Sequence, residues 1–303
     1  MSESYLKTQL EHFRHRINVR YNYYEMKNRV SMYDSILPKE LKHLSTSLGW
    51  CGKAVDTLAD RLSVYGFKND SFNIWETFQL NNADILIDSA ILSALIGSCS
   101  FIYISQDEDG YPRYQVIDGY DATGILDPIT NMLKEGYAIL EKDEHGNTIL
   151  SAYFEKGKTT FTSHITGESA VIENVARYPL LVPMIYRADA RRPFGRSRIS
   201  RACMKYTDFA IKNILLSSVS SEYYAFPQKW ISGLDEDTEI DTRRASLTDM
   251  LALTSGDNGN PTLGQFSTSS MTSYIDTMRM YASLFAGETG LTIDDLGFVQ
   301  DNH

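Results

Sequence analysis

The chain has 303 residues, of which 43% are hydrophobic and 22% are charged. This balance is ordinary for a globular protein and can bury a sizeable core in one large domain or two modest ones. The formal net charge of −10 argues against a protein whose main activity is tight binding of nucleic-acid phosphates, because that affinity comes from lysine and arginine.

The cysteines favour reduced, intracellular thiols. They are few, far apart and without CxxC spacing: Cys51, Cys99 and Cys203. The first twenty residues are highly charged and contain no apolar core, so no signal peptide is predicted.

The N-terminal third is helical in pattern, with predicted helices over residues 1–34, 41–62 and 74–96. The apolar run 85–104 is long enough to suggest a membrane span. Asp88 and Gly97 interrupt it, however, and its second half is β-branched and aromatic. A buried helix that ends near Gly97 and is followed by a strand is therefore predicted instead, and no membrane segment.

The first predicted helix carries a basic cluster in an otherwise acidic chain: His12, Arg14, His15, Arg16 and Arg20. A solvated helix face explains such a cluster, and so does a docking surface for a partner or for DNA.

From residue 100 to about 176 the pattern changes to short runs rich in β-branched and aromatic residues, beginning with FIYIS and ending with SAVIENVA. The turn signals DEDG, HGN, EKGK and TGE separate several of these runs. This segment is predicted to form antiparallel β-structure.

A long amphipathic helix is predicted over residues 198–223, and Pro227 cannot continue it. Two apolar stripes run along it, one through Ile199, Cys203, Tyr206, Ala210 and Ile214, the other through Met204, Ile211, Leu215 and Val219. Between them lies a polar stripe at spacings of four, three and four: Arg201, Lys205, Asp208 and Lys212. Such a helix needs a neighbour on each side, in a ring of identical helices around a wet channel or in an ordinary helical core.

Arginines are dense where this helix begins: Arg187, Arg191, Arg192, Arg196, Arg198 and Arg201. Cations at a helix N-terminus oppose the macrodipole. A surface loop explains the cluster, and an acidic partner would explain why it is tolerated.

A polar, turn-rich segment of about forty residues follows, and a second amphipathic helix comes after it with its own polar stripe: Thr272, Asp276, Arg279 and Ser283. Ser269 or Ser270 is the predicted N-cap, and Gly287 the predicted C-cap.

Five pieces of the sequence, taken in order, resemble the tailed-phage portal proteins of the SPP1-like class. They are GWCGKAVDTLADRLSVYGF from residue 49, ALIGSCSFIYI from 94, PLLVPMIYRADAR from 179, GRSRISRACMKYTDFAIKNILLSSVSSEYYAFPQKWISG from 195 and GETGLTIDDLGF from 287. The resemblance spans roughly residues 49–298.

The resemblance implies an α+β fold with the parts of a portal subunit. These are a helical part of the wing (1–99), an antiparallel β wing region (100–194), a first stem helix (195–226), a clip (227–268), a second stem helix (269–288) and a segment leading onward (289–303). The tunnel loop and crown of the family are expected to be missing.

The resemblance also implies a function. Portal subunits form a ring, twelvefold in the particle, at one vertex of the capsid in the virion, and they assemble in the host cytoplasm. Double-stranded DNA passes through the ring. Its further expected partners are the terminase large subunit, the major capsid and scaffolding proteins, and a head-tail connector.

Two surfaces are the predicted sites. The stem stripes are expected to line the channel or a subunit interface. The clip is expected to bind partners through Asp235, Glu236, Asp237, Glu239, Asp241, Arg243 and Arg244.

No catalytic motif is visible: GxSxG, HExxH and the phosphate-binding P-loop are all absent. We therefore expect no enzyme, cofactor or metal. Two alternatives stay open: a carboxylate-dependent metal hydrolase using the acidic run 235–241, and a monomeric α+β binding module.

Overall fold

The computed structural model describes residues 2–29, 46–225, 229–234, 250–254, 262–265 and 271–298. The chain divides into two compact units. Unit 1 comprises Met1–Arg29, Leu48–Lys205 and Glu288–Leu291, and unit 2 comprises Val30–Ser47, Tyr206–Gly287 and Thr292–His303. Helices and largely antiparallel sheets together make the predicted α+β class. The boundary between the units falls inside the long helix. It does not test the predicted limits of the wing, stem and clip, which stay predictions.

The helices that open unit 1 are shorter than the apolar periodicity predicts. They are α1 Ser2–Tyr24, α2 Trp50–Ala59, α3 Ile74–Gln79 and α4 Ala83–Gly97. The predicted helix 74–96 is wrong as a single element, because Asn82 adopts a left-handed conformation (φ 52°) between α3 and α4. Asparagine tolerates that conformation better than most residues.

Helix α4 ends where the sequence predicts, at Gly97, and the first strand, β1 Cys99–Gln106, starts two residues later. Within the residues that the structure describes, no helix is both long and apolar enough to cross a membrane.

Two antiparallel sheets form the rest of unit 1. The three-stranded sheet has the order β2-β1-β8, with β2 Pro112–Asp118 and β8 Leu181–Ile185. The five-stranded sheet has the order β3-β4-β5-β6-β7, and its strands are β3 Ala122–Leu126, β4 Leu133–Lys142, β5 Thr148–Glu155, β6 Lys158–Ser163 and β7 Ser169–Glu173.

The predicted turns are confirmed by the backbone. A glycine with positive φ lies in each of the four turn signals: Gly110, Gly146, Gly157 and Gly167. Strands β3 and β8 were not predicted. Strand β8 contains Pro183 and is the edge strand of the three-stranded sheet, where a proline is tolerated.

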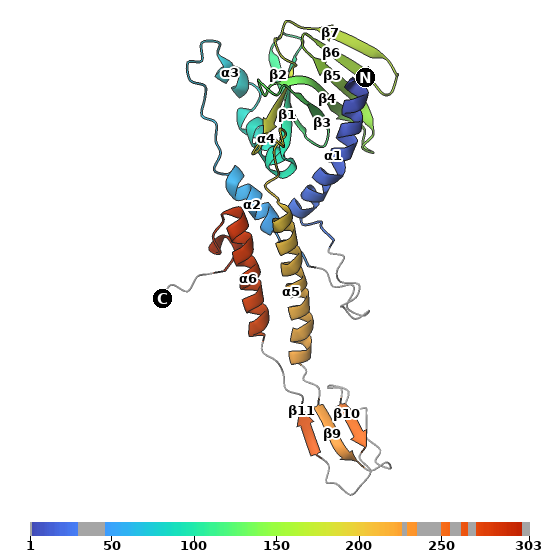
Figure 1. Cartoon of the computed structure of the whole chain (residues 1–303), viewed down its shortest axis with the longest axis vertical. Coiled ribbons are helices and arrows are strands. Elements are labelled where there is room, and N and C mark those ends of the chain that lie inside the picture. The colour runs from blue at the N-terminus through green and yellow to red at the C-terminus, as the bar shows by residue number, and fades with distance from the viewer. Residues whose placement is uncertain are drawn as a thin grey trace. The chain divides into compact units, whose positions relative to one another are not determined.

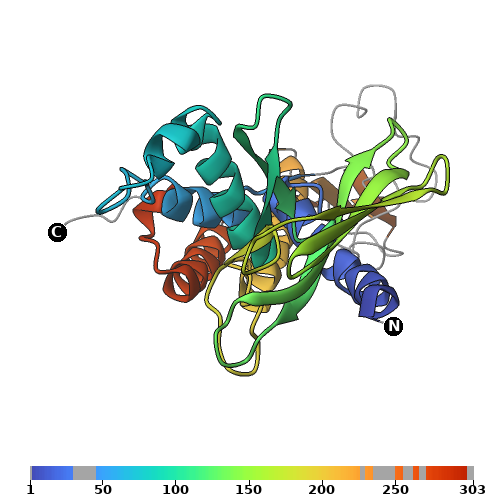
Figure 2. The same ribbon diagram turned by 90° about the horizontal axis from the view of Figure 1, so that it is seen from above.

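Helix α1 packs against the five-stranded sheet through Leu6 and Leu10, which contact Tyr137 and Ile139 of β4. Arg14 fixes the same helix further along, because its Nη2 donates to Asp121 Oδ1 at 3.1 Å. In Figures 1 and 2, α1 lies on one side of unit 1 and α3 on the opposite side.

The long helix is α5 Arg201–Ala225, and the second is α6 Thr272–Thr289. Within unit 2 they run antiparallel: Phe209 stacks near Tyr281, and Asn213 Nδ2 donates to the Tyr274 carbonyl at 2.9 Å. A small sheet of order β10-β9-β11 also belongs to unit 2, with β9 Lys229–Leu234, β10 Met250–Thr254 and β11 Thr262–Gln265. Strand β9 pairs with β10 in parallel and with β11 in antiparallel fashion.

The ends of both long helices differ from the prediction. The Ser200 hydroxyl accepts a hydrogen bond from Cys203 N at 3.2 Å, the geometry of an N-cap, so α5 starts at Arg201. The expected C-cap Gly287 lies inside α6, which continues to Thr289 before Gly290 adopts φ 70°. Ser269 and Ser270 lie outside the described residues.

Candidate functional site

The polar stripe of α6 is open to solvent in the isolated chain. All four of its members are exposed: Thr272, Asp276, Arg279 and Ser283. Exposed apolar side chains accompany them, namely Ile275 (52%), Met280 (50%) and Leu284 (45%). The helix therefore presents a mixed polar and apolar surface, of the kind that suits contact with another protein chain.

The polar stripe of α5 is not uniform. Arg201 and Lys205 are exposed and Lys212 is half-buried, but Asp208 is only 6% exposed. In the isolated chain Asp208 therefore does not share an exposed face with Arg201 and Lys205, and the role of the stripe stays a prediction. Helical spacing places residues on one side of a helix, but the segments that pack against the helix decide whether that side is exposed to water.

The two apolar stripes of α5 are largely buried inside the single chain. Members with 4% exposure or less come from both stripes: Ile199, Cys203, Ala210, Ile211 and Leu215. The single chain thus buries five of the nine stripe residues, while Met204, Tyr206, Ile214 and Val219 remain half-buried. The apolar surface left open on the two helices lies mainly on α6.

The arginine-rich loop is held together by Asp189. One carboxylate oxygen accepts hydrogen bonds from the backbone N–H groups of Arg191 and Arg192 at 2.9 and 2.8 Å. The other accepts from Arg196 Nε at 3.0 Å. The Arg196 hydrogen bond, followed by those backbone bonds, lowers the pKa of Asp189 below its usual value.

Arg198 serves the fold of unit 1. Its guanidinium donates to the carbonyl of Thr289 and, at 3.3 Å, to that of Ala54. Arg196 and Arg198 are thus engaged within the chain, whereas Arg192 and Arg201 remain exposed.

The structure brings two of these exposed arginines together with two from the N-terminal helix, a grouping that the sequence did not predict. Arg20 Nη1 donates to the Gly97 carbonyl at 3.4 Å. Burial, and then the charges of Arg16, Arg192 and Arg201, lower the pKa of Arg20 to about 10. No local sequence pattern predicts this cluster, because its members come from segments some 170 residues apart in the sequence.

The turn DEDG joins β1 and β2 as a hairpin, as predicted. Asp107 accepts from Tyr111 N at 2.8 Å and from Arg113 Nε at 2.9 Å. Over the described ranges, no group of three or more His, Cys, Asp or Glu side chains could hold a metal ion. The acidic and basic clip residues from Asp235 to Arg244 lie outside those ranges.

One histidine lies beside a hydroxyl. His164 Nε2 is 2.8 Å from Ser151 Oγ, across neighbouring strands. Ser151 is only 1% exposed, so its hydroxyl could not reach a substrate, and this pair is structural.

Residues 3–297 match the family described as "Phage portal protein, SPP1 Gp6-like". The chain therefore belongs to the SPP1 Gp6-like family of phage portal proteins, in agreement with the resemblance in its sequence.

Two relatives are portal proteins of mycobacteriophages. The chain is 24% identical to the portal protein of Mycobacterium phage L5, covering 93% of this chain and 62% of that one. It is 26% identical to the portal protein of Mycobacterium phage D29, covering 94% and 63%. The chain thus spans just over three fifths of the length of these relatives.

Two solved structures are similar. One is described as "Neck of native GTA particle computed with C12 symmetry", with a TM-score of 0.47 and 15% identity over 83% of this chain and 67% of that one. The other is a "Virion of native gene transfer agent (GTA) particle", with a TM-score of 0.42 and 13% identity over 83% and 77%.

Proposed function

We propose that this chain acts as a subunit of a closed, twelvefold ring at one vertex of a phage capsid, through which double-stranded DNA is packaged and ejected. The family match over residues 3–297 carries the proposal. The open, mixed surface of α6 supports it, because Ile275, Met280 and Leu284 are left for another chain to cover.

Such a ring would act by positioning DNA and its protein partners and through the charges that face the DNA, without making or breaking bonds. The channel face is proposed to include Lys212 of α5 and the exposed polar stripe of α6, with Arg279 as its basic member. The terminase large subunit, a head-tail connector, and the capsid and scaffolding proteins are the proposed partners, with the charged clip segment 235–244 as a docking surface. The ring is proposed to assemble in the host cytoplasm and to remain in the virion.

Assembly is tested by the mass of the native particle. We expect light scattering coupled to size exclusion to give one large, discrete mass, because heterologous contacts that close on themselves stop at a fixed number of copies. A monomer that persists at high protein concentration and moderate salt would count against the ring.

Catalysis is tested separately. Purified protein incubated with linear DNA, ATP and Mg²⁺ should show only background turnover, since the sequence holds no P-loop and the Ser151 hydroxyl is buried. Turnover that disappears in Asp237→Ala would instead support a carboxylate-dependent hydrolase.

A further inference from the structure

Four arginines of unit 1 form what we call the basic surface: Arg16, Arg20, Arg192 and Arg201. They come from α1, from the loop after β8 and from the first residue of α5. Arg20 contacts the Gly97 carbonyl at the carboxyl end of α4. The segment with the other two arginines is held at the same end, because Tyr186 N donates to Ser98 O at 3.0 Å and Arg198 N to Leu95 O at 2.7 Å. Arg16, Arg192 and Arg201 are exposed, and none of the three makes an ion pair within the described part of the chain.

This gathering is costly for an isolated chain. Like charges repel one another, and among the described residues the partly buried Arg20 side chain donates to a carbonyl oxygen and to no carboxylate. The carboxyl end of α4 carries roughly half a negative charge from the helix dipole, which offsets only part of four positive charges. An acidic surface placed against the arginines would stabilise them.

Acidic residues lie on α3 and on the first half of α4. Residues 74–97 contain Glu76, Asp84 and Asp88 and not one lysine or arginine. All three carboxylates are exposed, and none has an ion-pair partner among the residues that the structure describes. We call these three residues the acidic surface.

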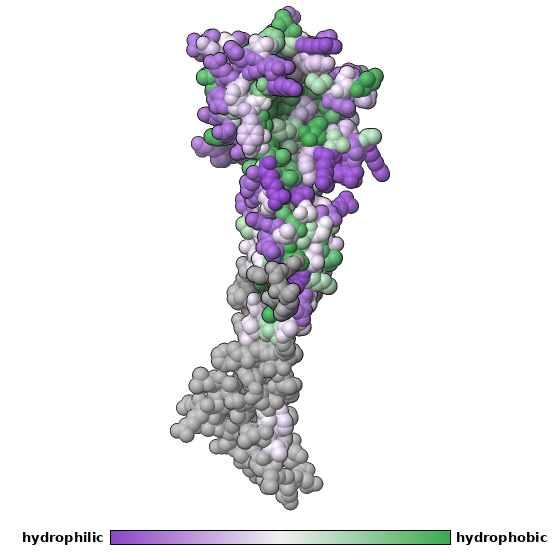
Figure 3. Space-filling model, turned by 90° about the vertical axis from the view of Figure 1, so that its left-hand side faces the viewer, coloured by the Kyte–Doolittle hydropathy of each residue, from purple (hydrophilic) through white to green (hydrophobic). Residues whose placement is uncertain are grey.

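Apolar side chains interrupt the acidic surface. Ile85 is 71% exposed between Asp84 and Asp88, and Leu80 is 59% exposed. Figure 3 faces this side of the molecule and shows hydrophobic residues lying open among hydrophilic ones. Exposed apolar groups next to charges gain stability when a protein covers them.

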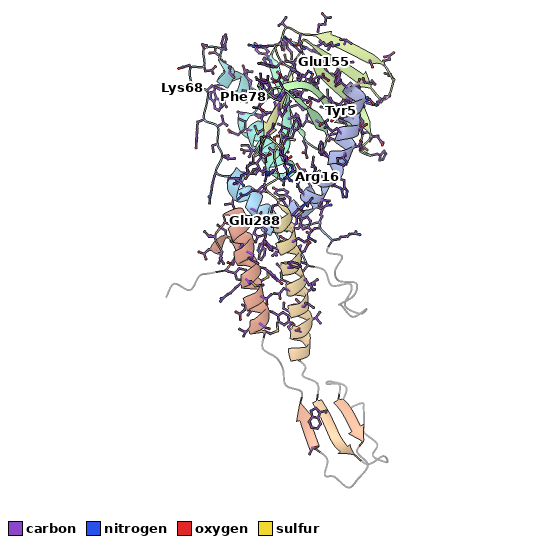
Figure 4. All side chains as sticks on the ribbon, in the orientation of Figure 1. Tyr5, Arg16, Lys68, Phe78, Glu155 and Glu288 are labelled. Carbon is purple, nitrogen blue, oxygen red and sulfur yellow. The ribbon has the colours of Figure 1, made fainter. Side chains whose placement is uncertain are left out.

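The two surfaces do not pair within one copy, since no ion pair joins them among the described residues. Along α4, Asp84 and Asp88 lie thirteen and nine residues before Gly97, which is about 20 and 14 Å at 1.5 Å per residue. Figure 4 labels Arg16 on α1 and Phe78 on α3, the helix that carries Glu76, and the two lie toward different sides of unit 1. Two different, complementary surfaces at separate places on one unit suit a head-to-tail contact between copies.

We propose that the basic surface of one copy binds the acidic surface of the next copy, and that this contact joins neighbouring subunits. The proposal rests on the ring of the proposed function and assigns a pair of its contact surfaces. A second copy is favoured over DNA as the occupant because the complementary carboxylates and the open Ile85 and Leu80 are present on the chain itself.

A charge exchange tests the contact. We expect Arg16→Glu/Arg192→Glu, and separately Asp84→Lys/Asp88→Lys, to reduce the ring fraction at a fixed protein concentration by about tenfold or more, because like charges then face each other. A protein that carries all four substitutions should recover rings, since the pairs are restored with their signs exchanged. Native mass spectrometry measures each fraction.

A charge exchange on distant turns provides the control, and like the fourfold variant it leaves the net charge unchanged. Lys156→Glu/Glu144→Lys alters exposed residues of the β5–β6 and β4–β5 turns and should leave assembly unchanged. Circular dichroism of every variant should match that of the parent protein, which separates a lost contact from a lost fold.

Four results would overturn the assignment. Rings that persist in both double variants would refute these surfaces while leaving the ring itself intact. Failure of the fourfold variant to recover, after both doubles lose rings, would refute direct pairing. Rings that persist in the arginine double variant together with weaker retention of a labelled DNA duplex would make the basic surface a DNA contact. A parent protein that is monomeric would refute the proposed function itself.

Discussion

Reversal of a single charge on either stem helix should leave the ring assembled and impair DNA packaging. We expect Lys212→Glu and Arg279→Glu each to lower the yield of DNA-filled heads by about tenfold or more, because the new carboxylate repels phosphates and is repeated in every copy around the channel. Arg279 is exposed on α6 and Lys212 is half-buried on α5. Packaging into heads, assayed as nuclease-protected DNA, measures the effect.

The matched control is Lys156→Glu, which reverses an exposed charge in a hairpin turn of unit 1. It should package like the parent protein. Normal packaging by both stripe variants would mean that neither stripe lines the channel. Loss of rings in those variants would make the stripes subunit contacts instead.

Binding of DNA to the assembled ring should itself be weak. The chain carries a net charge of −10, and Asp276 lies close to Arg279 on α6. A channel must let the duplex move, so we interpret this mixed surface as one that contacts phosphates without holding them.

The second large effect is expected at Gly195, where the arginine-rich loop turns back. Gly195 has φ +73°, and a Cβ there would lie 2.1 Å from the Tyr186 carbonyl oxygen, which also accepts the Arg196 N–H bond. Gly195→Ala should therefore lower the free energy of unfolding by far more than the roughly 1–2 kcal/mol that a left-handed backbone conformation costs a residue other than glycine. Urea unfolding followed by tryptophan fluorescence measures the loss.

Gly167→Ala is the matched control for that measurement. Gly167 has nearly the same backbone conformation, φ +74°, but nothing lies within 4 Å of its added Cβ. This variant should lose only the free energy that the left-handed backbone conformation costs an alanine, roughly 1–2 kcal/mol. Equal losses in the two variants would show that the contact at Tyr186 does not constrain the loop.

The class of fold and most of its local structure follow from the sequence. Gly110, Gly146, Gly157 and Gly167 mark turns because only glycine adopts positive φ without a steric cost. Antiparallel hairpins are local, so alternating strands and these turns predict much of both sheets of unit 1. The end of α4 at Gly97 was predicted in the same way, by an apolar helix that gives way to β-branched residues.

Tertiary structure decided what depends on distant segments. Strand β8 joins β1 across some 75 residues, and no local pattern records that pairing. Asp208 lies on the polar stripe of α5 by its spacing yet is buried, because exposure is set by whatever packs against a helix. The basic surface joins Arg16 and Arg20 to Arg192 and Arg201 for the same reason. Spacing in a sequence determines the direction of a side chain on its own element, whereas burial and charge clustering depend on which elements meet in space.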